Sequence, residues 1–194
     1  MASRIVRSRA SAPGSTRRAT GYARRIGEGV YEGENAMFRN MRRIRQQLSD
    51  AECIAILKNE LRGVLSVLGD DDWPYGMPLN HWYCEADGVL YFHGGTSGHK
   101  IDAVTKHDKA SFCVYDTGER RAGDWALHFR SVIVFGRVKI IADREKTLEI
   151  CRQLSAKFTS DTAYIEDEIQ QAGDAVLCFA LIPEHITGKR VKES

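Results

Sequence analysis

The 194-residue sequence lacks a long uninterrupted apolar run, and a membrane-spanning helix requires roughly 18 such residues. No membrane association is therefore expected. The sequence also lacks a Cys-x-x-Cys pair, which argues against a zinc site or a disulfide framework. Its cysteines stand singly in apolar segments and are expected to be reduced core thiols of a reducing compartment. They are Cys53, Cys84, Cys113, Cys151 and Cys178.

Motifs for several common chemistries are missing as well. There is no Gly-x-Ser-x-Gly elbow and no pair of carboxylates at a strand end, so hydrolase chemistry has no support. No histidine pair has the spacing of metal ligands, and no metal site is expected. The segment Gly98-His99-Lys100 is followed by Ile101 rather than Ser or Thr, which excludes a Walker P-loop.

Acidic residues are scarce at the start of the chain. Residues 1–48 hold eleven Arg and no Lys against three Glu, a local charge of +8, whereas the whole chain carries +2. We expect residues 1–40 to form a basic, disordered extension and 41–194 to form one folded domain. An arginine-rich, acid-poor start is also typical of a mitochondrial presequence. The stronger alternative is a tag, a leader or an over-long gene start, because Met37 and Met41 precede the first helix signal. The expected location is the cytoplasm, with the mitochondrion as the alternative if the arm is a presequence. Without interleaved aromatic residues, no nucleic-acid binding is expected.

Hydrophobic residues make up 43% of the chain, which is enough for a core. The first clear element signal is a capping box at Ser49 and Glu52, which predicts a helix that ends at Arg62-Gly63. Helices are also expected at about 99–104, 144–158 and 164–171.

Two β-type runs flank the three aspartates at 70–72 and predict a hairpin of strands 64–69 and 73–84. Pro74 and Pro78 remove two backbone donors from the second strand, so it should lie at a sheet edge or contain a bulge. Further strands are expected at 89–93, 109–115, 125–141 and 175–182. Strands joined by hairpins, with helices mainly at the ends, predict an α+β protein with an antiparallel barrel or sandwich.

The segment 89–104 combines a strand, a glycine-rich loop and a helix start. Free amides at a helix N-terminus, the hydroxyls of Thr96 and Ser97, and the Lys100 amine together favour a phosphate dianion. The alternative is a plain turn followed by a solvated lysine. His93, at the end of the apolar strand, is either a hydrogen-bonded core or rim residue or a group with a chemical role.

Arg130 precedes the apolar run 131–136. It is expected either at the mouth of a barrel, where it would suit an anionic ligand, or buried at an energetic cost. Aromatic residues such as Trp73 and Tyr75 add apolar surface, which is more typical of core or subunit contacts than of ligand stacking.

Several blocks in order resemble the pyridoxamine 5'-phosphate oxidase-like flavoproteins, nearest the nitroimidazole-resistance (Nim-type) group. The resemblance covers about residues 41–190. It implies a split β-barrel that forms a homodimer and holds FMN in clefts at the dimer interface. The blocks are GVLS at 63–66, PYGMPLN at 74–80, YFH at 91–93, GHKIDA at 98–103 and FRSV at 129–132.

The resemblance also implies roles for individual residues. His93 would point at the flavin site and could act as a proton donor. The residues implied to face the FMN phosphate are Thr96, Ser97, His99 and Lys100, those beside the flavin ring are Pro78, Leu79 and Asn80, and those that reach the ring from the partner subunit or its rim are Arg130, Ser131 and Val132.

The sequence departs from pyridoxamine phosphate oxidases proper at two places. Gly98-His99 stands where those enzymes carry an Arg-Lys pair, and residues 186–191 read ITGKRV instead of an Arg-Leu-x-Pro ending. The expected activity is therefore FMN-dependent reduction of small electrophiles such as nitroaromatic compounds, with an unidentified electron donor for which NAD(P)H is a candidate. A pyridoxamine or pyridoxine phosphate oxidase and a non-catalytic flavin- or haem-binding module are the alternatives.

Overall fold

A computed structural model describes residues 38–123, 125–172 and 175–192. Most of the expected basic extension, residues 1–37, lies outside the described residues. Phe38 stacks on the ring of His185, with 4.8 Å between ring centroids, so contact with the sheet begins at the first described residue. No helix in the described ranges is long and apolar enough to cross a membrane.

Eight strands and four α-helices make up the described chain. The helices are α1 (Asp50–Asn59), α2 (His99–Lys106), α3 (Arg144–Ala156) and α4 (Thr162–Ala172), with two short 3-10 turns, η1 (Ile44–Gln46) and η2 (Asp70–Asp72). The strands are β1 (Arg62–Leu68), β2 (Pro74–Asn80), β3 (Trp82–Cys84), β4 (Val89–Gly95), β5 (Lys109–Tyr115), β6 (Glu119–Arg120), β7 (Leu127–Ile141) and β8 (Val176–Lys192).

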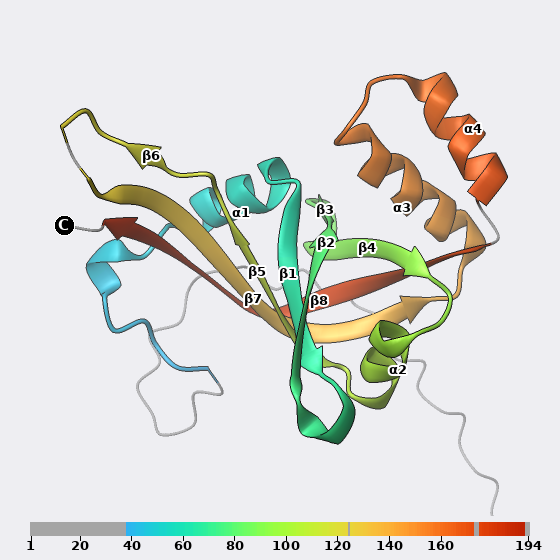
Figure 1. The fold of residues 1–194 in the computed structure, drawn as a ribbon, viewed down its shortest axis with the longest axis horizontal. Coiled ribbons are helices and arrows are strands. Elements are labelled where there is room, and N and C mark those ends of the chain that lie inside the picture. Colours follow the sequence, from blue (N-terminus) through green and yellow to red (C-terminus); the bar gives the residue numbers. More distant parts are fainter. Residues whose placement is uncertain (1–37, 124, 173–174, 193–194) are drawn as a thin grey trace, which may run out of the picture.

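All eight strands belong to one antiparallel sheet, in the order β2-β1-β5-β7-β8-β4-β3, with β6 paired to β7. Figure 1 shows this sheet curled on itself, with α1 over one opening, α2 at the opposite end and the α3–α4 hairpin outside. The predicted α+β class with an antiparallel barrel is therefore confirmed. Dimerisation stays a prediction.

The two edges of the sheet come from one stretch of chain. We expected a single strand over 73–84, and that expectation is wrong, because the stretch divides at His81 into β2 at one edge and β3 at the other. The edge position predicted for β2 from Pro74 and Pro78 is confirmed. In this curled sheet the first and last strands lie at different edges, so a segment that contributes to both edges must leave one strand and enter the other.

His81 is fully buried where the chain passes from one edge to the other. Its Nε2 lies 2.8 Å from the carbonyl oxygen of Leu57 at the end of α1, and its ring meets that of Phe112 edge-on. Lys157 donates to the His81 carbonyl oxygen at 2.9 Å and to that of Glu60 at 2.6 Å. Burial, and next to it the charge of Lys157, lowers the pKa of His81 to about 4, so the ring is neutral at pH 7.

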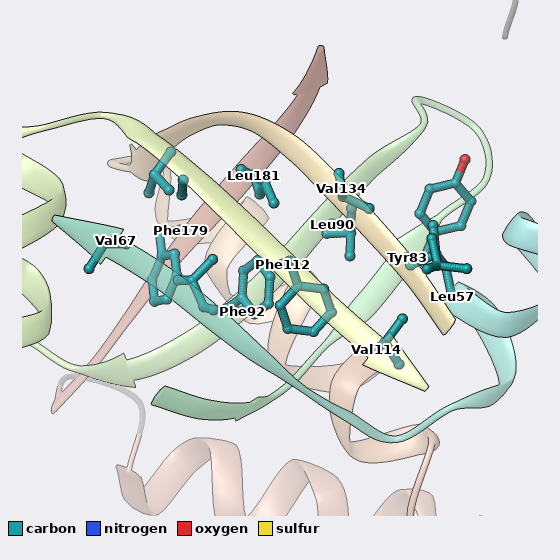
Figure 2. Close-up of a cluster of buried hydrophobic side chains, with 14 of the residues drawn as sticks. Leu57, Val67, Tyr83, Leu90, Phe92, Phe112, Val114, Val134, Phe179 and Leu181 are labelled. Atoms are coloured by element: carbon teal, nitrogen blue, oxygen red, sulfur yellow. The ribbon is translucent and has the colours of Figure 1, made fainter. Parts of the chain in front are cut away.

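Two apolar clusters fix which way the side chains of β4 point. The main cluster fills the barrel and includes Phe92, Phe112 and Phe179 (Figure 2). The second lies between α3 and the outer face of β4 and β8, and it includes Tyr91 and Cys178. Because side chains alternate along a strand, Phe92 points into the barrel whereas Tyr91 points outward.

The capping box and the alternation of β7 are confirmed. The Ser49 hydroxyl accepts from the Glu52 amide at 3.4 Å, and the Ser49 amide donates to the Glu52 carboxylate at 2.9 Å. Along β7, alternate residues are buried (Val132, Val134, Gly136 and Val138), and the residues that separate them are exposed (Ile133, Phe135 and Arg137). The helix ends three residues earlier than expected, at Asn59.

β8 is longer than predicted because it continues through Pro183 to Lys192 instead of ending at residue 182. The register with β7 shifts between Phe135 and Gly136, and this bulge accommodates a proline that has no amide to donate. The two-residue strand β6 was not expected.

Acidification should destabilise the fold through His81. Its folded pKa lies below the unfolded value of 6.5, so its contribution is complete above pH 6.5 and is lost as the pH falls toward 4. The free energy of unfolding should fall by about 3 kcal/mol over this window through this group. Urea unfolding at a series of pH values measures the loss, and His81→Gln, whose amide can still donate to Leu57, should flatten the slope. A ring titration of His81 by NMR with a midpoint near pH 6.5 would contradict the assignment.

Candidate functional site

The predicted phosphate loop joins β4 to α2. β4 ends at Gly95, and Gly98, with a φ of 107°, directly precedes α2. The Gly98 carbonyl oxygen accepts hydrogen bonds from the amides of Ile101 and Asp102. Such a positive φ favours glycine. Thr96 and Ser97 are exposed between these ends. Two exposed hydroxyls therefore stand directly before the start of α2, where Gly98 already accepts two of the first-turn amides.

Lys100 directs its amine back over the inner side of the barrel end. Its Nζ lies 5.5 Å from the centroid of the Phe179 ring, and a Cβ built at Gly94 would collide with Nζ, so the bare glycine leaves room for the lysine. Burial lowers the pKa of Lys100. No described residue forms a hydrogen bond or ion pair with this amine, so the charge beside the helix start is not neutralised.

His99 already has a structural partner. Its ring stacks on Tyr75 of β2 with 4.2 Å between centroids, and its Nε2 lies 3.7 Å from a carboxylate oxygen of Asp70. These contacts fasten α2 to the β1–β2 hairpin. The side chain is thereby directed toward that hairpin.

His93 is exposed on the outer face of β4, opposite Cys178 in the ladder. Partial burial, and next to it the charge of Lys100, lowers the pKa of the ring. Successive residues of a strand face opposite sides of the sheet, so Gly94 faces the side opposite to His93. The Lys100 amine lies over Gly94, so His93 and this amine are on the two different faces of the strand end.

The remaining predicted residues lie on β2 and β7. Pro78 is opposite Val64 in the ladder, and the Asn80 side-chain oxygen accepts from Arg62 Nε at 2.8 Å. Leu79 packs partly against the core, and Val132 is fully buried in it, so only the backbone of Val132 could face a ligand. Ser131 is half-buried.

Arg130 is about half exposed and forms an ion pair that the sequence did not indicate. Its Nε lies 2.7 Å from Asp116, and its backbone amide donates to the same carboxylate at 2.8 Å. Burial alone would raise the pKa of Asp116, but the hydrogen bonds from Arg130 hold it below its usual range. Arg130 is thus exposed rather than buried, and its charge is partly neutralised.

One chain brings the predicted residues together in two groups rather than one. His93, Thr96, Ser97 and Lys100 gather at the α2 end. Arg130 lies ten residues before Ile140, which pairs with Phe179 beneath Lys100. At roughly 3.3 Å per residue this is about 30 Å of strand, and Figure 1 shows the start of β7 and α2 at opposite ends of the sheet.

Two clefts lie elsewhere on the surface. One, of about 750 Å³, runs between the β1–β2 hairpin and the end of α2, and includes Pro74, Lys106 and Phe135 in its lining. The other, of about 450 Å³, lies between η1 and α1, with Glu52 and Arg190 in its lining. The predicted site residues line neither cleft.

The curled antiparallel sheet, with a glycine-rich loop leading into α2, defines a split-barrel protein. A family model described as pyridoxamine 5'-phosphate oxidase matches residues 49–190, which is most of the described chain. The chain therefore belongs to the pyridoxamine 5'-phosphate oxidase family, as the sequence blocks predicted. No curated protein matches it.

Solved structures with the same fold come from several bacteria. A protein assigned to 5-nitroimidazole antibiotic resistance from Bacteroides thetaiotaomicron is 16% identical, with a TM-score of 0.62 over 85% of this chain and 97% of that one. A FAD-binding protein from Mesorhizobium loti is 22% identical, with a TM-score of 0.54 over 75% of this chain and 97% of that one. A FAD- and haem-binding protein from Mycobacterium smegmatis is 18% identical, with a TM-score of 0.61 over 77% and 74%.

Replacing Asp116 with Asn should expose the contribution of its ion pair with Arg130. We expect the free energy of unfolding to fall by about 1 kcal/mol at pH 7, a modest value because the arginine is half exposed. The Asp116 pKa is lowered on folding, so its stabilisation is present above the usual carboxyl range and disappears as the pH falls through the folded pKa. Urea unfolding at pH 7 and pH 3 tests both points. The control Asp72→Asn, at an exposed position with a φ of 60° that Asn also tolerates, should be close to neutral.

Proposed function

We propose that this protein is an FMN-dependent oxidoreductase that reduces small electrophiles, nitroaromatic compounds among them, and that it works as a homodimer. The observation that carries the proposal is the unpaired Lys100 amine beside the start of α2, at the end of a loop that leaves amides and hydroxyls exposed. Membership of the pyridoxamine 5'-phosphate oxidase family supports a flavin as the ligand.

The β4–α2 end fits a phosphate monoester. The N-terminus of α2 carries partial positive charge, Lys100 adds a full charge, and Thr96 and Ser97 can donate hydroxyl hydrogen bonds. Gly94 and Gly95 have no side chains to block the approach, and a Cβ at Gly95 would meet nothing within 4 Å. A dianionic ligand would also reverse the effect that burial has on the Lys100 pKa.

The ring end of the ligand requires a second copy of the chain. Arg130 and Ser131 lie too far along β7 to reach a ligand whose phosphate is at the α2 end of the same chain. The outer face beside them exposes Tyr115, Ile133 and Phe135, which is apolar surface that a partner subunit would bury. We infer that each site combines the α2 end of one protomer with the Arg130 region of its partner.

The flavin, when bound, supplies the electron or hydride transfer. The chain supplies position and charge. Arg130 favours an anionic reduced ring, less strongly than a free arginine would because Asp116 neutralises part of its charge. His93 is mostly neutral at pH 7 because its pKa is lowered. Proton donation from His93 to the substrate should therefore increase as the pH falls toward that pKa.

The first experiment is a visible absorption spectrum of the purified protein, followed by heat release and chromatography of the ligand. Two flavin bands and released FMN support the proposal, and released FAD would correct the cofactor. A colourless protein that takes up neither added FMN nor FAD would overturn it. Oxygen uptake with pyridoxamine phosphate would favour the second candidate, the oxidase for which the family is described. Bound flavin that no donor reduces would favour a binding module.

Replacing Lys100 with Ala should weaken FMN binding by about 10- to 100-fold, because a charge-assisted hydrogen bond contributes about 1.5–3 kcal/mol. Fluorescence titration of the flavin-free protein measures the dissociation constant. Lys106→Ala removes the same charge from the exposed C-terminal end of the same helix and should leave the constant unchanged. Equal affinity for the Lys100 variant and wild type would exclude the phosphate assignment.

Replacing His93 with Ala should leave FMN bound and lower kcat with a nitroaromatic substrate by about 100-fold. The lost donor should also remove the rise in kcat on acidification. Steady-state kinetics from pH 5 to pH 8 measure both effects, and the flavin content of the variant provides the control. An unchanged rate at every pH would show that His93 has no chemical role.

A further inference from the structure

Two cysteines outside the proposed site lie side by side, contrary to the expectation that each stands singly. Cys151 is on α3 and Cys178 is on β8, 27 positions apart in the sequence, and their sulfur atoms are 3.9 Å apart. The sequence did not indicate the pair, because it is formed only when α3 packs against the outer face of β8.

The two thiols have different surroundings. Cys178 is fully buried, and its single S–H can donate either to the carbonyl oxygen of Thr147, 3.8 Å away, or to the Cys151 sulfur. Cys151 is only half-buried and is therefore the more exposed residue of the two. The charges of Arg144 and Arg152 act on its sulfur, and Arg152 is itself bound to Glu166 at 2.5 Å.

These surroundings shift the pKa values of the two thiols in opposite directions. The hydrogen bond with Cys178 lowers the pKa of Cys151, burial opposes this, and the charges of Arg144 and Arg152 add smaller lowering effects, so that the net shift is downward. The same hydrogen bond, and next to it burial, raises the pKa of Cys178. By contrast, burial raises the pKa of the Cys53, Cys84 and Cys113 thiols. Cys151 is thus the thiol of this chain that most readily forms a thiolate.

We propose that Cys151 and Cys178 are a redox-active pair, in which a hydroperoxide oxidises the accessible Cys151 and Cys178 then closes an intramolecular disulfide. The proposal rests on the sulfur–sulfur distance and on the contrast between one accessible and one enclosed thiol. It does not depend on the identity of the flavin or its substrate.

The chemistry balances with one hydroperoxide. The Cys151 thiolate attacks a peroxide oxygen, the O–O bond breaks, and water (or an alcohol) leaves while Cys151 becomes a sulfenic acid. The Cys178 sulfur then attacks the Cys151 sulfur, the S–S bond forms and the S–O bond breaks. The hydroxide leaves as water with the Cys178 proton, so two thiols are oxidised and one peroxide is reduced.

Closing the bond requires a small movement. A disulfide is about 2.05 Å long, so the sulfurs must approach by about 1.9 Å from their present 3.9 Å. Cys178 is held in the ladder on both sides, by Ile141 of β7 and by His93 of β4. The movement therefore falls on the Cys151 side chain and α3, and the product would fasten that helix to the strand opposite His93.

The test uses the purified full-length protein as it is, exposed to hydrogen peroxide, then alkylated with iodoacetamide and digested without reduction. We expect a peptide cross-linked between Cys151 and Cys178, a mass loss of about 2 Da in the intact chain and reversal by dithiothreitol. Before oxidation, alkylation at pH 7 should label Cys151 several-fold faster than Cys84 or Cys113, both of which are also half-buried.

Variants separate the two roles. Without its resolving partner, in Cys178→Ser or the apolar Cys178→Ala, Cys151 should proceed to sulfinic or sulfonic acid. Cys113→Ser, the matched control, should still give the cross-link. The proposal is overturned if wild-type Cys151 over-oxidises while Cys178 stays a free thiol, if the cross-link joins another cysteine, or if peroxide leaves both thiols unchanged. The wild-type peptide map decides these outcomes even if a Cys178 variant does not fold.

Discussion

The buried hydrogen bond between His81 and the end of α1 is the contact on which the arrangement of this molecule depends. One segment of chain must serve both edges of the sheet, and it can do so only if it leaves β2, crosses the barrel opening and enters β3. His81 makes this crossing inside the protein, tied to Leu57 by its ring and to Lys157 by its carbonyl oxygen. Because β3 pairs with β4, this closure also positions the strand that leads into the glycine-rich loop.

The charges of the candidate site follow from this geometry. The curled sheet separates Lys100 at one end from Arg130 at the other. Of these two cations, Arg130 has an ion-pair partner among the described residues and Lys100 has none. A cation without an ion-pair partner at a helix start favours an anion strongly, whereas a partly neutralised arginine favours an anion less strongly. The proposed site needs both ends and would be complete only across two protomers, and β7 exposes apolar side chains that the proposed dimer would bury.

Local signals predicted much of the fold correctly. The capping box at Ser49 acts within four residues, the prolines of β2 cannot donate to a neighbouring strand, and the alternation of β7 reflects burial of one face. The errors arose where distant partners decide the outcome. Pro183 would normally end a strand, but a bulge opposite Phe135 lets β8 continue. The Asp116 partner of Arg130 carries no local signal, because it comes from a loop 14 positions away.

The sequence by itself determined the family and most of the element types, because these depend on residue identity and short spacing. Tertiary structure alone decided that 73–84 divides between two sheet edges, that Lys100 lies over Phe179 while Arg130 pairs with Asp116, and that Cys151 meets Cys178. Each of these depends on the curl of the sheet and the packing of α3, which bring together atoms whose separation along the chain gives no indication of contact.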